Sequence, residues 1–154
     1  MDTFFIFGAK YLIILSVLIA AWFFYKFPHK RKLAIFGFCS LALTFILAKI
    51  GAHFYNDPRP FVTEGFTPLI PHAPDNGFPS DHMLLASALP AIIIYYSRKY
   101  AIVLWIIAII IGLSRIYVGV HHRIDVVGSV IFAVVATGIA HYVLWKYKIT
   151  GPVE

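Results

Sequence analysis

Two long apolar segments are separated by the stretch Ser114-Arg115-Ile116-Tyr117-Val118-Gly119-Val120-His121-His122-Arg123-Ile124-Asp125. If the flanking segments cross a membrane, two arginines, two histidines and one aspartate lie at its edge, where polar groups are costly and usually functional. An arginine, a histidine and an aspartate in this order can bind an oxyanion, attack it, and orient the attacking group. The stretch therefore predicts a helical membrane fold with a reactive site at one end.

The composition is that of an integral membrane protein. The 154 residues are 60% hydrophobic and 13% charged, with a mean hydropathy of +0.82, whereas soluble domains are about one-quarter charged. The length suffices for a single domain, residues 1–154. The net charge of +6 does not indicate a nucleic-acid partner, because the basic residues are scattered between apolar runs. The single cysteine, Cys39, excludes an intrachain disulfide.

Five segments are apolar and long enough to predict an all-α bundle of about five transmembrane helices. The first is expected to be an uncleaved span, because Ala20-Ala21 leads directly into aromatic residues. The third is the shortest and contains Pro90, which predicts a kink, with an amphipathic or re-entrant course as the alternative. The segments are Phe4–Tyr25, Leu33–Tyr55, His82–Tyr96, Tyr100–Tyr117 and Ile124–Trp145.

Charge distinguishes the two sides of this bundle. Eight of the thirteen basic residues follow spans one, three and five, which five crossings place on one side. By the positive-inside rule that side is cytoplasmic, so we expect the N-terminus outside, the C-terminus inside and residues 114–125 facing outward. The eight residues are Lys26, Lys30, Arg31, Lys32, Arg98, Lys99, Lys146 and Lys148.

Three polar clusters are expected on the outer side, each at the end of a span. They are residues 56–61, residues 77–82 and the stretch 114–125. The loop Asn56–Ser80 joins the first two and holds six of the nine prolines. Because proline fixes φ and lacks an N–H donor, this loop is expected to be irregular but stiff, and the three clusters are expected to converge.

The side chains of these clusters suit phosphoryl transfer, which requires mainly positioning and charge stabilisation. Arg59 and Arg115 carry planar guanidinium groups that match phosphate oxygens. Ser80 and the backbone amides of residues 80–82 form a helix N-terminus, which favours anions.

Two histidines and an aspartate supply the predicted chemistry. His121 can attack phosphorus and form a phosphohistidine. Asp125 lies one helical turn further on if span five begins there, and it would leave one imidazole nitrogen free to attack. His82 would act as general acid for the leaving oxygen and later as the base for water.

These residues resemble the signatures of the type 2 phosphatidic acid phosphatase superfamily. The third signature, S-R-x-x-x-G-x-H-x-x-x-D, is matched at every fixed position by Ser114, Arg115, Gly119, His121 and Asp125. Pro79-Ser80-Asp81-His82 is similar to the second signature, usually Pro-Ser-Gly-His, and Arg59-Pro60 is similar to the end of the first. The resemblance runs from about Lys49 to the end of span five. It implies a membrane phosphatase that uses neither a metal nor a cofactor.

Within that superfamily the chain is similar to the bacitracin-resistance-type undecaprenyl-pyrophosphate phosphatases. Asp81 replaces the usual glycine as in that branch, and residues 59–62, 69–73 and 78–82 resemble it as well. The resemblance implies removal of the terminal phosphate of undecaprenyl diphosphate, a polyprenyl diphosphate lipid, at the outer membrane face. That reaction recycles the lipid carrier for cell-wall synthesis. A short N-terminal interfacial segment of that branch is not expected before the first span.

Several assignments stay open. Lys49 lies farther from the Arg-Pro pair than in the family pattern, so it is a candidate either for a phosphate ligand or for a structural residue. Asp81 is expected to cap span three, with tuning of His82 as a second role. His72 is either interfacial or functional, and His122 is expected to point away from the site. No set of His, Cys and Glu has the spacing of zinc ligands.

Other functions remain as alternatives to an undecaprenyl-diphosphate phosphatase. The enzyme alternatives are a broader lipid phosphatase acting on phosphatidic acid or phosphatidylglycerol phosphate, and a lipid phosphotransferase. The non-enzyme alternative is a small membrane transporter with an anion-binding lip. Membrane lipids are the only other partners expected, and the sequence does not specify an oligomeric state.

Overall fold

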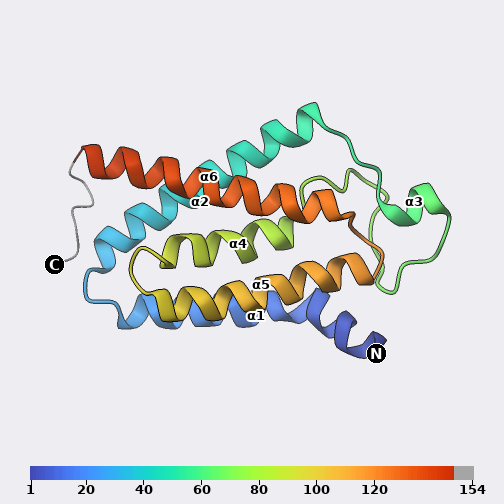
Figure 1. Cartoon of the computed structure of the whole chain (residues 1–154), viewed down its shortest axis with the longest axis horizontal. Helices are drawn as coiled ribbons and strands as arrows, with labels where there is room; N and C mark the ends of the chain where they lie inside the picture. Colours follow the sequence, from blue (N-terminus) through green and yellow to red (C-terminus); the bar gives the residue numbers. More distant parts are fainter. Residues whose placement is uncertain (148–154) are drawn as a thin grey trace.

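The computed structural model describes residues 1–147 (Figure 1). These residues form five long helices, one short helix and the connections between them. The predicted all-α fold is confirmed, and each apolar segment forms a helix whose ends lie within three residues of the prediction. Lys148 and the end of the predicted domain fall outside the described residues. The helices are α1 (Asp2–Lys26), α2 (Lys30–Phe54), α3 (Pro60–Glu64), α4 (Asp81–Ile93), α5 (Arg98–Tyr117) and α6 (Arg123–Lys146).

Successive long helices run in opposite directions along the bundle (Figure 1). The basic ends of α1, α2, α5 and α6 therefore lie at one end, which carries Lys26, Lys30, Arg98 and Lys146. At the opposite end, α2 and α5 finish and α4 and α6 begin, and the connection between α2 and α4 folds over them. We call this connection, residues 55–80, the long loop, and this side of the bundle the loop end.

Helix α4 differs from the predicted membrane span in length and in surroundings. It has 13 residues, of which nine are buried, and 1.5 Å per residue gives it a length of about 20 Å. The hydrocarbon core of a bilayer is about 30 Å thick, and within residues 1–147 only the other four long helices are long and apolar enough to cross it. A short apolar segment has the same sequence pattern whether protein or lipid surrounds it. The sequence therefore did not distinguish this buried helix from the membrane spans.

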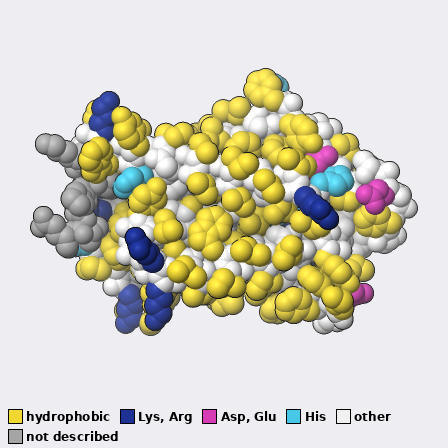
Figure 2. Space-filling model, viewed as in Figure 1, with side chains coloured by type: hydrophobic (Ala, Val, Ile, Leu, Met, Phe, Trp, Pro, Cys, Tyr) yellow, Lys and Arg dark blue, Asp and Glu magenta, His cyan; other side chains and the backbone are white. Residues whose placement is uncertain are grey.

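The outward faces of the four longer helices are apolar. Large side chains such as Leu18, Ile106 and Ile131 are more than half exposed. Figure 2 shows hydrophobic side chains covering the middle of the visible face, with most of the basic side chains at one end and the acidic side chains, beside one basic side chain, near the other. An exposed apolar belt of this extent marks a surface that meets lipid, so the chain is an integral membrane protein.

The amide of Asn76 joins parts of the long loop to one another and to the end of α2. Its Oδ1 accepts hydrogen bonds from the backbone N–H groups of Asp57 and Phe78, at 2.9 and 3.0 Å. Its Nδ2 donates to the carbonyl oxygens of Ala52 and Tyr55, at 3.3 and 3.2 Å. The loop was predicted to be irregular throughout, but it contains the single turn of α3, which begins at a proline in the favourable first position.

Small side chains let α6 lie close to the start of α4. The hydroxyl of Ser129 donates to the carbonyl oxygens of Ser80 and Asp125, at 3.0 and 2.7 Å. A side chain at Gly128 would collide with the ring of Phe78. Close backbone approach at small residues is the usual way in which membrane helices pack, and here it brings the start of α4 against the start of α6.

Candidate active site

Two arginines converge on one nitrogen of His121 at the loop end. The Nε2 atom of His121 lies 3.2 Å from Nη2 of Arg115 and 3.4 Å from Nη1 of Arg59. Arg115 belongs to the last turn of α5, Arg59 directly precedes α3, and His121 lies in the connection between α5 and α6. All three side chains are at least 95% buried, so two positive charges and an imidazole share a space from which most water is excluded.

The connection between α5 and α6 turns back at Gly119. This residue has φ of +79°, in the left-handed region that glycine adopts without strain, and a side chain there would meet Phe66. Backbone bonds from Val118 to Ser114 and from Val120 to Arg115 close the turn, at 3.0 and 3.3 Å. The reversal returns the chain toward Arg115, and this explains why His121, two residues after Gly119, faces that guanidinium.

Asp125 fixes the orientation of the His121 ring. Its Oδ2 lies 3.1 Å from Nδ1 of His121 and accepts the backbone N–H of His122 at 2.9 Å. A carboxylate only accepts hydrogen bonds, so Nδ1 carries the proton and Nε2 keeps its lone pair. One helical turn would separate the two residues only if the last span began at His121, and this condition is not met, because α6 begins at Arg123. The contact forms across the helix cap.

The imidazole of His121 is held in its neutral form. Burial lowers its pKa to about 2, with further contributions from the charges of Arg115 and Arg59. A neutral ring keeps the lone pair on Nε2, which is the form that can act as a nucleophile. The guanidinium of Arg115 lacks one hydrogen-bond acceptor, because its Nε is buried and has no partner among residues 1–147. An anion beside Nε2 would supply one.

A cavity of about 700 Å³ adjoins these groups. Its polar end is lined by Arg59, Arg115, His121 and His82, and an apolar wall on α2 includes Phe45. Lys49, whose role was left open, lines this wall as well. The site therefore combines a cationic end with an apolar wall that continues along a membrane helix.

The three residues at the start of α4 have different surroundings. His82 lines the cavity and is half-buried. Ser80 is fully buried and is not among the residues that line the cavity, and its hydroxyl has no partner in the described part of the chain. Asp81 lines the cavity but is exposed, and it occupies the first position inside α4. The predicted cap by Asp81 is wrong, because Ser80 is the cap residue and makes no side-chain cap bond.

The long loop contributes groups that the sequence argument did not assign. Asp75 accepts a hydrogen bond from Nε of Arg59 at 2.7 Å, and this contact holds the pKa of its carboxyl below the ordinary value. Nη1 of Arg59 also donates to the carbonyl oxygen of Val120 at 2.8 Å. His72 lies 3.1 Å from Nη2 of Arg115. These contacts join residues more than 15 positions apart, and of Asp75 and His72 only His72 had a signal in the sequence, through its place in the Pro-rich loop and the similarity of residues 69–73 to a phosphatase branch.

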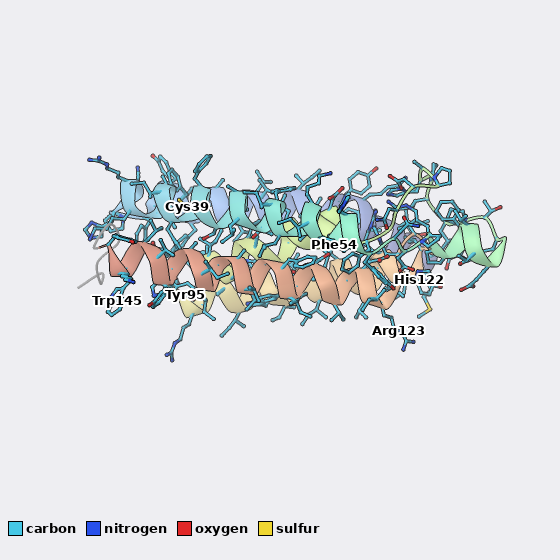
Figure 3. All side chains as sticks on the ribbon, turned by 90° about the horizontal axis from the view of Figure 1, so that it is seen from above. Cys39, Phe54, Tyr95, His122, Arg123 and Trp145 are labelled. Atoms are coloured by element: carbon cyan, nitrogen blue, oxygen red, sulfur yellow. The ribbon has the colours of Figure 1, made fainter. Side chains whose placement is uncertain are left out.

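His122 points away from the cavity, as the sequence argument expected. Its Nδ1 lies 2.9 Å from Oδ2 of Asp57. Figure 3 shows His122 at the loop end, where α6 begins, with the side chain of Arg123 directed away from the bundle. Burial and the nearby charge of Asp125 raise the pKa of Asp57. His122 thus links the loop after α2 to the start of α6.

Asp57, His122 and Asp125 are a group that sequence spacing did not reveal. Their potential metal-ligating atoms lie within 4.8 Å of one another, and no ion is needed to explain this. Asp57 and His122 are hydrogen-bonded to each other, and Asp125 binds His121 and the His122 amide. These bonds account for the closeness of the three side chains.

Comparisons with known proteins identify the family of this chain. Residues 32–149 match the model of the family described as the PAP2 superfamily. The chain is 33% identical over 140 residues to undecaprenyl-diphosphatase BcrC of Bacillus subtilis strain 168, covering 88% of this chain and 70% of that protein. It is 28% identical over 141 residues to a Bacillus licheniformis protein named bacitracin transport permease protein BcrC, covering 90% of this chain and 68% of that protein.

A solved structure has the same fold. The crystal structure of Aquifex aeolicus LpxE superposes with a TM-score of 0.70 over 91% of this chain and 82% of that chain, at 24% sequence identity. The family match covers most of the sequence and includes all the signature residues, from Arg59 to Asp125. The chain therefore belongs to the PAP2 superfamily and is a membrane-embedded phosphatase.

Proposed function

We propose that this phosphatase removes the terminal phosphate of undecaprenyl diphosphate through a phosphohistidine on His121. The arrangement around that imidazole carries the proposal. Its Nδ1 is bound to Asp125 at 3.1 Å while its Nε2 faces Arg115 at 3.2 Å. A phosphoryl group at Nε2 would meet a nucleophile, an orienting carboxylate and two guanidinium groups together.

In the first step, the lone pair on Nε2 of His121 attacks the terminal phosphorus. The bond between that phosphorus and the bridging oxygen breaks, and undecaprenyl phosphate leaves with the bonding electrons. Arg59 and Arg115 stabilise the charge on the equatorial oxygens, and Asp125 stabilises the positive imidazole through Nδ1–H. His82 donates a proton to the leaving oxygen.

In the second step, water attacks the phosphohistidine. His82, now neutral, accepts a proton from the water as the new P–O bond forms and the N–P bond breaks. Inorganic phosphate leaves, and His121 and His82 return to their starting protonation states. Because a phosphate monoester is a better leaving group than an alkoxide, we expect His82 to matter more in this step than in the first.

The shape of the cavity supports a lipid diphosphate as substrate. The diphosphate would occupy the cationic end, with Lys49 as a candidate ligand of the phosphate nearer the lipid. The hydrocarbon chain would follow the apolar wall on α2, where Phe45, Ala48 and Ala52 line the cavity. The similarity to the Bacillus subtilis protein named undecaprenyl-diphosphatase BcrC supports the same substrate.

The distribution of charge supports an extracytoplasmic active site. Lys26, Lys30, Arg98 and Lys146 lie at the end of the bundle opposite the long loop. Under the positive-inside rule that basic end is cytoplasmic. The cavity would then open at the outer face, where the lipid carrier is released after use.

Phosphate release by purified protein tests the substrate. The assay compares undecaprenyl diphosphate, phosphatidic acid and phosphatidylglycerol phosphate, with His121→Ala as the inactive control. We expect the diphosphate to have the highest kcat/KM. A strong preference for phosphatidic acid would favour a broader lipid phosphatase, and full activity in His121→Ala would defeat the phosphohistidine mechanism.

Radiolabelled substrate distinguishes a hydrolase from a phosphotransferase. We expect the terminal phosphate to appear as inorganic phosphate, and label in a lipid acceptor would indicate transfer instead. Expression in a bacitracin-sensitive bacterium provides a cellular test. Protection that is lost in His121→Ala is the expected result.

A further inference from the structure

His72 extends from the long loop into the catalytic cavity. It lines the cavity together with Arg115 and His121. Its Nε2 lies 3.1 Å from Nη2 of Arg115, and this same Nη2 atom lies 3.2 Å from Nε2 of His121. The two imidazole rings meet edge to face, with centroids 6.1 Å apart. One guanidinium nitrogen is thus flanked by the attacking imidazole and by a second imidazole without an assigned role.

The hydrogen bonds of His72 define its protonation in the substrate-free protein. An arginine only donates, so Nε2 of His72 accepts the N–H of Arg115. Nδ1 lies 3.4 Å from the carbonyl oxygen of Ala73, which only accepts, so Nδ1 carries the proton. Burial and the charges of Arg59 and Arg115 lower the pKa of His72, in agreement with a neutral ring.

A bound phosphate would reverse the polarity of this contact. Phosphate oxygens accept hydrogen bonds, and Arg115 would turn its N–H groups toward them. Nε2 of His72 would then present a lone pair to an anionic oxygen, which is repulsive unless the nitrogen gains a proton. The anion also offsets the guanidinium charges that keep the ring neutral.

We propose that His72 is a phosphate-binding residue that takes up a proton from solvent when phosphate arrives and donates it, as an N–H bond from Nε2, to a phosphoryl oxygen. The proposal rests on the proposed function only in placing a phosphoryl group beside Nε2 of His121. It adds a third cation to Arg59 and Arg115 without requiring that charge to be buried in the empty site.

The surroundings of His72 allow this change in charge. Arg59 and Arg115 oppose protonation from the start of α3 and from α5, and His82 faces it from α4. Asp75 of the same loop favours protonation. Since Asp75 is already paired with Arg59 in the free protein, the arriving phosphate is the group that alters the balance.

Calorimetric titration of purified protein with inorganic phosphate tests the proposal without any lipid. His72→Asn keeps a polar side chain but cannot become a cation, and we expect it to weaken phosphate binding by about tenfold, the effect of one charged hydrogen bond. His72→Lys restores a cation and should recover part of the affinity. His53→Asn, at an exposed position on α2 that does not line the cavity, is the matched control.

Proton uptake gives the second readout. Repeating the titration in buffers of different ionisation enthalpy counts the protons bound with each phosphate. We expect uptake by the wild type and by His53→Asn, and reduced uptake by His72→Asn. Unchanged affinity and uptake in His72→Asn would overturn the proposal, and so would equal losses in the Asn and Lys variants with an unaltered melting temperature.

A steady-state experiment separates this proposal from the proposed function. With the substrate that the enzyme prefers, His72→Asn should raise KM more than it lowers kcat, most strongly below neutral pH, where the wild-type ring is protonated in the complex. If prenyl diphosphates are not hydrolysed, the proposed substrate is wrong, while the phosphate titrations still decide the role of His72.

Discussion

Arg59 donates from Nε to Asp75 at 2.7 Å, although Asp75 is 62% exposed and Arg59 is buried. The carboxylate holds the guanidinium in place but also puts a negative charge near the expected phosphate. Asp75→Asn retains an oxygen acceptor and removes the charge. We expect kcat within about twofold of the wild type, because an ion pair with an exposed partner contributes little. We expect a slightly lower KM, because the negative charge near the phosphate is removed.

Asp75→Ala separates orientation from charge, since it removes the acceptor altogether. We expect kcat/KM to fall by about tenfold, the scale of one hydrogen bond to a charged group. Steady-state kinetics of the two variants is the measurement. Equal losses in both would show that the charge of Asp75, and not its hydrogen bond, supports Arg59.

Asp125→Asn should abolish turnover without unfolding the protein. An amide can donate to Nδ1 of His121, which would place the ring proton on Nε2 and remove the attacking lone pair. A comparable substitution in a serine-protease triad lowers kcat by about 10⁴-fold. Phosphate release and thermal unfolding in detergent are the two measurements, and a kcat within tenfold of wild type would contradict the assigned orientation.

His82→Ala should slow the hydrolysis of the phosphohistidine more than its formation. With substrate labelled in the terminal phosphate, we expect a burst of undecaprenyl phosphate close to one equivalent per enzyme and label retained on the protein. The label should be acid-labile, as phosphohistidine is, and absent in the double variant with His121→Ala. Slow release without a burst would instead assign His82 to the first step.

Gly119→Ala should damage both the fold and the site. The residue has φ of +79° and faces Phe66, and a strained backbone position of this kind costs about 1–3 kcal/mol. We expect a lower melting temperature and a large loss of kcat, because the turn directs His121 toward Arg115. Gly37→Ala is the control, since a side chain there meets nothing within 4 Å.

Acid should destabilise the wild type through His121. The pKa of this ring is lower in the folded protein than its ordinary value near 6.5, so the unfolded chain binds the extra proton as the pH falls below that value. Stability should fall by about 1.4 kcal/mol per pH unit for one such group. Melting temperatures between pH 8 and pH 5 should decline more steeply for the wild type than for His121→Asn, and parallel curves would contradict a neutral buried ring.

Metal removal should leave turnover unchanged, because the proposed steps use only side chains and water. Treatment with a chelator followed by dialysis is the experiment, with activity and the melting temperature measured together. Loss of activity that Zn²⁺ or Mg²⁺ restores would contradict the mechanism. It would direct attention to Asp57, His122 and Asp125, whose potential ligand atoms lie within 4.8 Å of one another.

The apolar segments and the signature spacing carried most of the prediction. Hydropathy located the five long helices, and the order Arg115, His121, Asp125 identified groups that the fold brings together. Local pattern did not reveal that α4 is surrounded by protein, because burial depends on neighbours from distant parts of the chain. The contacts of His72 and Asn76 were missed for the same reason, since each joins the long loop to a helix far away in the sequence.

The short, buried helix α4 also bears on how the enzyme responds to its membrane. A bilayer that is too thick or too thin tilts or displaces the helices that touch lipid, but α4 has nine of its 13 residues buried. His82 is therefore carried by a helix that is screened from such mismatch. The working distance between His82 and the phosphate should be set by protein contacts, so that catalysis tolerates membranes of different hydrocarbon thickness.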